Sequence, residues 1–287
     1  MFTNWIDDVE RVTHDLNSKI KVFDLKTIDI SESILKDISK RVLISLCNPE
    51  NVKFQCSGED LDDLKKYIKN HVIPEKDSLK NVYIQKSTWG EIISAEVLKE
   101  FRNHLLPIYR LRHKEKKNFA MRSDADVLSC VCSNDNFFIA LSEVKTNGDT
   151  YYSPKKYQGI INDAYCHLLK NDIDEPEVIN HMNNLLINEG KYDLAKIFNK
   201  HFKNFSKRKK EFHIFLIREK RRWKDDVLKM FKDNCIKCKK KDDEYEYITL
   251  PNNLIINIVL IDQLNEIINS TYELIPEIAE EVVYNDE

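Results

Sequence analysis

The sequence predicts an α/β protein, in which strands alternate with helices along the chain. Short apolar runs rich in β-branched residues, such as 212–217 and 254–260, have the length and composition of strands. Between them lie longer segments whose apolar residues recur every three or four positions, which is typical of helices that pack on a sheet. The 287 residues include 42% hydrophobic residues and only 5 Gly, which favours a large core of regular elements over flexible linkers.

The N-terminal region is expected to mix strands and helices. Apolar runs at 20–25 and 41–47 predict strands, whereas the spacing of apolar positions predicts helices at 31–39 and 61–71. We assign residues 1–82 to a separate N-terminal α/β region, which is a candidate for binding a partner.

The remaining residues, 83–287, are predicted to form the core of the protein and to end in a basic C-terminal region. From 87 to 169 we expect a helix, a basic loop, a strand, a tight turn, a second strand, a loop and a helix. Helices, a strand at 212–217, an amphipathic helix at 223–231 and a strand at 254–260 are expected to follow.

Positive charge is concentrated in two stretches, although the net charge is only −3. Residues 200–241 contain 17 Lys and Arg against 5 Asp and Glu, and residues 99–122 form a second basic stretch. Such clusters are expected of a protein that binds a nucleic-acid backbone, and a solvated lysine-rich face is the alternative. The longest apolar run, 254–261, is too short to span a membrane, and no glycine-rich motif indicates a small-molecule cofactor.

The seven cysteines, an odd number, fit a reducing compartment better than a disulfide framework. The first eight residues lack the basic and apolar segments of a secretory signal. We therefore expect a cytoplasmic protein.

An acid and a base, Glu143 and Lys145, stand two residues apart at the end of the apolar run 137–140. In a strand both side chains project from one face, where unpaired charges are unfavourable. A hairpin centred on 134–135 pairs positions whose numbers sum to about 269. It therefore places Asp126 opposite Glu143 and Asp124 opposite Lys145, so that carboxylates and an ammonium group converge.

Glu91 is a further candidate acid, on a preceding helix whose apolar stripe includes Ile93 and Val97. Glu91 lies at the edge of the stripe and can reach a sheet beneath it, whereas Glu96 lies away from the stripe. A structural role competes with this one: the run 88–91 has the form of a capping box, in which Glu91 would bond the backbone N–H at the helix start.

Converging carboxylates beside a lysine are suited to metal-dependent phosphate chemistry. Mg²⁺ prefers oxygen ligands and is typically held by one or two carboxylates together with water and substrate phosphate. A nearby lysine can orient the attacking water or stabilise developing negative charge. A buried ion-pair network, such as Asp124 with Lys145, is the competing interpretation.

These motifs occur in an order that resembles the PD-(D/E)xK nucleases: an acid-bearing helix, a hairpin carrying Asp and then Glu-x-Lys, and a following helix at 155–169. Three of them in a chain of this size are similar to the HamA family, the nuclease subunits of Hachiman anti-phage systems: Gly90-Glu91, Ser123-Asp124-Ala125 and Ser142-Glu143-Val144-Lys145. The resemblance covers residues 87–169. The proline of the motif is absent before both Asp124 and Asp126, which leaves open which aspartate is the ligand.

The resemblance implies a mixed central sheet flanked by helices, with a restriction-endonuclease-like core and N- and C-terminal additions. It implies an Mg²⁺- or Mn²⁺-dependent deoxyribonuclease that works with a helicase partner, a HamB-like subunit. Glu91, Asp124, Asp126 and Glu143 would hold the metal, and Lys145 would assist the attacking water. The residues expected to contact DNA are Arg112, Lys116, Lys117, Arg122 and Gln158.

Two other functions fit the same residues. One is a standalone restriction-type endonuclease, which would give discrete DNA fragments without a partner. The other is a non-catalytic nucleic-acid-binding or adaptor protein, in which Glu143 and Lys145 form a structural pair.

Overall fold

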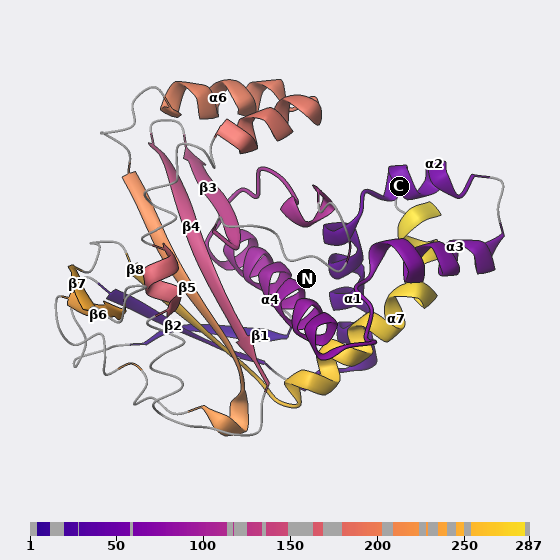
Figure 1. Cartoon of the computed structure of the whole chain (residues 1–287), viewed down its shortest axis with the longest axis horizontal. Helices are drawn as coiled ribbons and strands as arrows, with labels where there is room; N and C mark the ends of the chain where they lie inside the picture. Colours follow the sequence, from indigo (N-terminus) through magenta and orange to yellow (C-terminus); the bar gives the residue numbers. More distant parts are fainter. Residues whose placement is uncertain are drawn as a thin grey trace.

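A six-stranded mixed sheet forms the centre of the protein (Figure 1). The computed structural model describes residues 5–11, 20–27, 29–57, 60–113, 117, 125–133, 136–148, 163–168, 180–202, 209–223, 228, 235–239, 245–249 and 254–284. The strands of this sheet lie in the order β1-β2-β8-β5-β4-β3. Their bounds are β1 Ile6–Arg11, β2 Ile20–Thr27, β3 Val127–Ser133, β4 Asn136–Asn147, β5 Lys209–Glu219 and β8 Leu254–Ile261.

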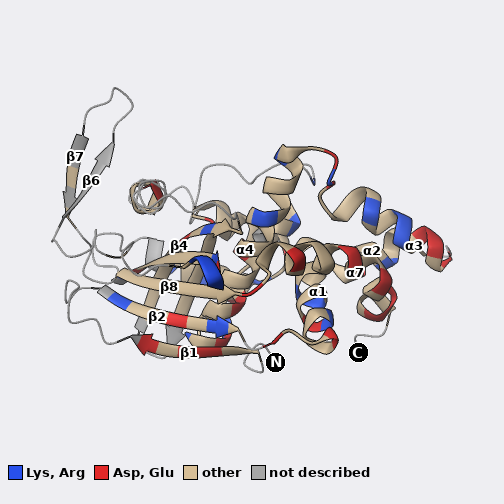
Figure 2. Ribbon diagram, turned by 90° about the horizontal axis from the view of Figure 1, so that it is seen from below, with Lys and Arg blue, Asp and Glu red and all other residues tan. Residues whose placement is uncertain are grey.

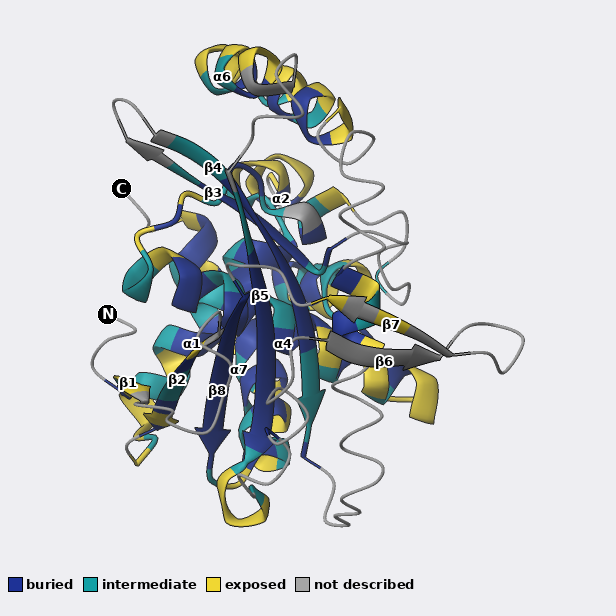
Figure 3. Cartoon of the chain, turned by 90° about the vertical axis from the view of Figure 1, so that its left-hand side faces the viewer, coloured by how far each residue is buried: buried dark blue, intermediate teal, exposed yellow. Residues whose placement is uncertain are grey.

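The four central strands, β2, β8, β5 and β4, are parallel to one another, and the edge strands β1 and β3 pair antiparallel to their neighbours. Strand β8 is buried along its whole length, and its sequence, Leu-Ile-Ile-Asn-Ile-Val-Leu-Ile, is the near-continuous apolar run expected of a strand covered on both faces (Figure 3). The predicted mixed sheet flanked by helices is confirmed.

One face of the sheet is covered by a layer of helices built on α1 (Glu32–Leu46), α4 (Leu79–Phe101) and α7 (Leu264–Tyr284). Smaller helices extend this layer: α2 (Pro49–Gln55), α3 (Leu61–Tyr67) and a π-helical turn (Ile68–Val72). Side chains of Ser31, Asn48, Asp60 and Ser78 accept hydrogen bonds from backbone N–H groups at the starts of α1 to α4. The helices therefore begin where the sequence supplies a capping oxygen.

Charged residues are spread along the helices of this layer (Figure 2), and ion pairs join α1 and α3 to α7. Lys36 and Lys40 of α1 both pair with Glu281, and Lys65 of α3 pairs with Glu277. These pairs are partly exposed to solvent, which screens them, so each adds little to stability. The buried apolar contacts between the helices carry most of the stabilisation.

The opposite face of the sheet packs against helical residues 163–168, helical residues 180–188 and helix α6 (Tyr192–Phe202). Tyr165, Leu186 and Phe198 are buried in this second core. The Tyr165 hydroxyl donates a hydrogen bond to the carbonyl of Thr249, at 2.8 Å, in the separate two-stranded sheet of β6 (Cys235–Lys239) and β7 (Tyr245–Thr249). None of the helices among the described residues is long and apolar enough to cross a membrane.

The strands predicted at 20–25, 212–217 and 254–260 are found. The helix predicted at 61–71 is also found, as α3 together with the π-helical turn that follows it. The strand predicted at 41–47 is wrong, because these residues continue α1. Their buried positions recur with helical spacing, and α1 packs against α7 and α4, so the apolar run fits a helix as well as a strand. The predicted helix at 223–231 lies mostly outside the described residues.

The N-terminal strands β1 and β2 join the same sheet as the core, through the pairing of β2 with β8. The boundary at 82–83 stays a prediction. Among the described cysteines, Cys47, Cys56 and Cys130 are free thiols, whereas Cys166 is disulfide-bonded.

Candidate functional site

The hairpin of β3 and β4 has the predicted register. Val127 pairs with Ser142 and Ser133 with Asn136, so paired numbers sum to 269 along the ladder. Asp126, directly before β3, therefore lies at the level of Glu143. Its Oδ2 accepts a hydrogen bond from the backbone N–H of Val144, at 2.7 Å. Just beyond the end of β3, the Asp126 carboxylate thus takes the place of a backbone acceptor for β4.

Glu143 and Lys145 form a contact pair on one face of β4. The Lys145 ammonium group donates to Glu143 Oε1 at 2.6 Å, and the Glu143 side chain is only 5% exposed. His167 Nδ1 lies 3.1 Å from the same oxygen. The guanidinium of Arg218, a buried residue of β5, donates to the carbonyl oxygen of Lys145 at 2.9 Å.

His167 and Arg218 were not predicted from the sequence. Helical residues 163–168 bury Ala164, Tyr165 and Leu168 against the sheet, which leaves His167 largely exposed but within reach of Glu143. No sequence motif marks His167, because its position depends on how this short helix crosses the sheet. Arg218 continues the apolar strand β5, and an arginine at the end of such a strand is the one sequence signal for a buried cation.

Glu91 lies in the middle of α4, since this helix begins at Leu79 with Ser78 as its N-cap. The predicted capping box is therefore wrong, and its apparent N-cap, Thr88, is a buried residue within the helix. Glu91 and Asp126 line the same small, open pocket, beside Ser45 and Tyr109. Glu91 therefore does not cap the helix, which was the structural role that competed with its role as a metal ligand.

Gly90 explains how α4 comes close enough to β4 for this arrangement. A methyl group added at Gly90 would overlap the Thr146 hydroxyl and lie 3.4 Å from Val144 Cγ1. The helix backbone therefore rests directly on the strand, which requires a residue with no side chain. This contact sets the position of Glu91 along α4 relative to Val144 on β4.

The site consists of two halves on opposite sides of β4. Val144 belongs to the core beneath α4, so Glu91 lies on that side, whereas Glu143 and Lys145 share the face of Leu141 with His167. Within the part of the chain that the structure describes, Glu91, Asp126 and Glu143 do not bring one oxygen each within 4.8 Å of one another. The predicted convergence is therefore partial, and Asp126 at the strand edge is the residue between the halves.

The two described residues predicted to contact DNA make contacts within the protein. Arg112 is partly buried, donates to the carbonyl of Ile44 at 2.7 Å and lies over the ring of Tyr109. Burial lowers the pKa of Arg112 from its ordinary value. The Lys117 ammonium group lies 2.8 Å from Glu75. Other predicted site residues lie outside the described residues: Asp124, Lys116, Arg122 and Gln158.

A mixed six-stranded sheet flanked by helices, with an acid and a lysine on its fourth strand, defines an α/β protein consistent with a restriction-endonuclease-like core. The chain matches the HamA family over residues 1–275, and it belongs to that family. This membership assigns the protein to anti-phage defence and to a multi-component system. The comparison with curated proteins found no match.

Proposed function

We propose that this protein is a metal-dependent nuclease that cleaves DNA phosphodiester bonds as the effector of an anti-phage defence complex. The observation that carries the proposal is the contact of Glu143 with Lys145 beside the peptide N–H that binds Asp126. These are the acid, acid and base of a phosphodiesterase site, and the register brings them to one stretch of β4. Membership of the HamA family supports the defence role.

The donor set fits Mg²⁺ or Mn²⁺. Asp126 and Glu143 offer carboxylate oxygens, and Glu91 lines the pocket that Asp126 also lines. An ion held by one or two carboxylates, with water and phosphate as its other ligands, does not require all three acids to meet at one point. Asp124, beyond the described residues, remains a proposed ligand. Such an ion would polarise the phosphate and make a bound water more acidic.

The residues of this chain have separate tasks in the proposed reaction. Lys145 orients the attacking water and stabilises negative charge on the phosphate, because its ammonium group is partly exposed next to the acids. Glu143 holds that ammonium group in position. Arg218, a buried residue of β5, fixes the peptide of Lys145 through its hydrogen bond to the carbonyl oxygen.

The partner in this proposal is a HamB-like helicase that controls the nuclease. The N-terminal region is a candidate surface for the helicase, and the basic segment 200–241 is a candidate surface for either DNA or the helicase. Arg112 and Lys117 are weaker candidates for DNA contacts than the sequence indicates, because their charged groups already bind within the protein.

Plasmid cleavage tests the proposal. Glu143→Gln and Lys145→Met should abolish cleavage in Mg²⁺ or Mn²⁺, with and without the helicase partner, while circular dichroism and melting temperature stay close to the parent. Lys196→Met is the matched control, because Lys196 makes an exposed ion pair with Asp193 on α6. Cleavage by both site variants at the parent rate would assign the activity to other residues.

The direct contact of Glu143 with Lys145 also supports a second function, a non-catalytic nucleic-acid-binding or adaptor protein in which the pair is structural. That function predicts salt-sensitive DNA binding and no metal-dependent cleavage in the complete complex. A standalone restriction-type endonuclease would instead give discrete fragments without the partner.

A further inference from the structure

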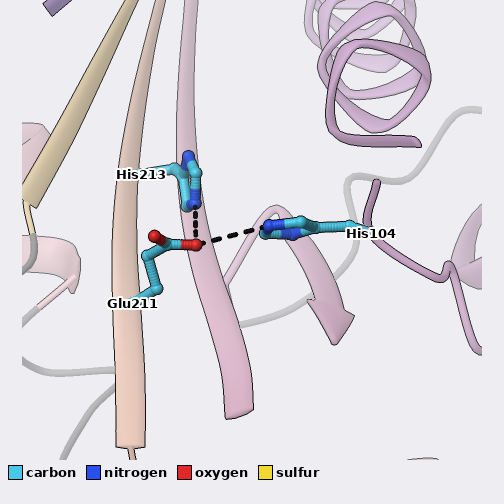
Figure 4. Close-up of side chains that lie close together, drawn as sticks. All are labelled: His104, Glu211 and His213. Atoms are coloured by element: carbon cyan, nitrogen blue, oxygen red, sulfur yellow. Dashed lines mark hydrogen bonds and ion pairs between the residues drawn. The ribbon is translucent and has the colours of Figure 1, made fainter. Parts of the chain in front are cut away.

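A second cluster of ionisable side chains lies on the α4 side of the sheet, on the opposite face from Glu143 and Lys145. It consists of His104, just beyond the end of α4, and Glu211 and His213 of β5 (Figure 4). The Nε2 atoms of His213 and His104 lie 3.0 Å and 3.3 Å from the same oxygen, Oε2 of Glu211. Within the described residues, this is the one group of three or more potential metal ligands whose donor atoms all lie within 4.8 Å of one another.

The two nitrogen–oxygen separations are close to those between ligands of a small tetrahedral ion. Zn²⁺ binds imidazole nitrogen and carboxylate oxygen at about 2.0–2.2 Å, so its ligand atoms are roughly 3.3–3.6 Å apart. Both nitrogen–oxygen distances are within a few tenths of an ångström of this range, and the two nitrogens lie within 4.8 Å of each other, so they would have to approach Oε2 and each other around a bound ion. Two histidines and one glutamate form a ligand set that zinc proteins use with a water molecule as the fourth ligand.

The surroundings hold both imidazole rings in place. His104 Nδ1 is 2.8 Å from the Ser129 hydroxyl, and His213 Nδ1 is 3.3 Å from the side-chain nitrogen of Asn257. A metal-binding histidine usually donates its second ring N–H to an acceptor, and the Ser129 hydroxyl can accept from His104 Nδ1 in this way. Both histidine side chains are at most 3% exposed, whereas that of Glu211 is 22% exposed, so water and ions reach the cluster from the Glu211 side.

Hydrogen-bond directions show which proton an ion would displace. Arg102 can only donate, and it donates to Asn257 Oδ1 at 3.2 Å, so the Asn257 amide nitrogen faces His213. His213 Nδ1 therefore accepts, and in the neutral ring the proton sits on Nε2, directed at Glu211. An ion on Nε2 would move this proton to Nδ1, where Asn257 presents a donor. Asn257 thus opposes metal binding in its present orientation, whereas an acidic side chain at this position would favour it.

From this geometry we infer that His104, Glu211 and His213 bind a divalent transition-metal ion of the zinc class. The ion ties the segment after α4 to β5, and its site is separate from the proposed Mg²⁺ site. The nearby positive charge of Arg102 is balanced by its ion pair with Asp8, so it does not exclude a cation. The inference is independent of the proposed nuclease function.

Metal content of the purified full chain tests the inference. After removal of metal with EDTA and dialysis against Zn²⁺, the parent protein should retain one equivalent per chain and melt at a higher temperature than the metal-free form. His213→Asn and Glu211→Gln should lose this equivalent, whereas His181→Asn, at an exposed helical position, should keep it. Mg²⁺ alone should not raise the melting temperature through this site.

The variant Asn257→Asp provides a second test, in which metal binding should increase, so that a folding defect cannot explain the expected result. Its carboxylate can accept from both Arg102 and the Nδ1–H of a metal-bound His213, so zinc affinity should rise by about tenfold or more, measured by competition with a chromophoric chelator. X-ray absorption of the zinc-loaded parent should show two imidazole ligands. Zinc retention no greater than in His213→Asn, with no gain in Asn257→Asp, would mean that the cluster is a hydrogen-bond network only and would overturn the inference.

Discussion

Asp126 accepts a hydrogen bond from the backbone N–H of Val144, the residue between Glu143 and Lys145. Strand β3 pairs with β4 only as far as Ser142, so this N–H has no strand partner on that side. The aspartate therefore has a structural role, as a substitute for the missing backbone, in addition to its proposed role as a ligand. Substitutions at Asp126 can separate the two.

Asp126→Asn should retain the fold and lose cleavage. The amide oxygen can still accept from the Val144 N–H, but the negative charge needed for a divalent cation is gone. Asp126→Ala should also lose cleavage and should lower the free energy of unfolding by about 1.5 kcal/mol, because the partly buried N–H loses a charged acceptor. Urea unfolding and plasmid cleavage measure the two effects. An asparagine variant as active as the parent would remove Asp126 from the proposed metal site.

Gly90→Ala should destabilise the protein by roughly 1–3 kcal/mol, because the added methyl group overlaps Thr146 and forces α4 away from β4. Activity should fall together with stability, since the same contact sets the position of Glu91. The double variant Gly90→Ala with Thr146→Ala removes the overlapping hydroxyl and should recover part of the loss. Equal unfolding free energies for the single and double variants would mean that the Thr146 contact is not the cause.

Glu96→Ala should be among the more destabilising charge removals, at about 3 kcal/mol, because Glu96 is 4% exposed and pairs with Arg41 of α1. Arg41 also contacts Glu100 at 2.8 Å, which limits the loss. Lys66→Ala breaks the exposed pair with Asp63 and should change stability little, because solvent screens this pair. Thermal and urea unfolding compare the two variants. Similar losses in both would show that burial of the Glu96 pair has little effect.

The sequence predicts those parts of the fold and site that depend on local pattern. The positions that face each other across the β3–β4 hairpin follow from the turn expected at 134–135, so the placement of Asp126 beside Glu143 could be inferred. The run 41–47 could not be assigned, because a short apolar segment suits a strand or a helix until its packing partner is known. That partner, α7, comes from the other end of the chain.

The parts of the fold and the site that the sequence does not predict depend on tertiary contacts. The sequence predicts that Glu96 lies away from the apolar stripe of its helix, yet it is buried, and it pairs there with Arg41 of α1. The cluster of His104, Glu211 and His213 joins segments far apart in the chain, at spacings that match no metal-binding motif. Its members meet only because the segment after α4 passes over β5.

The Glu211 carboxyl should stay ionised in the metal-free protein to unusually low pH. Burial alone would raise the pKa of Glu211, but hydrogen bonds from His104 and His213 outweigh burial and lower this pKa to about 2. Because the folded-state pKa lies below the ordinary value of 4.5, Glu211 contributes stability above about pH 4.5, and this contribution is lost as the pH falls toward 2. Carboxyl ¹³C shifts of glutamate-labelled protein in EDTA should show one glutamate that does not titrate before the chain unfolds. In His104→Asn the pKa of this carboxyl should move upward, because one donor is lost while burial remains. A Glu211 signal that titrates near 4.5 in the parent protein would contradict the hydrogen bonds that define the cluster.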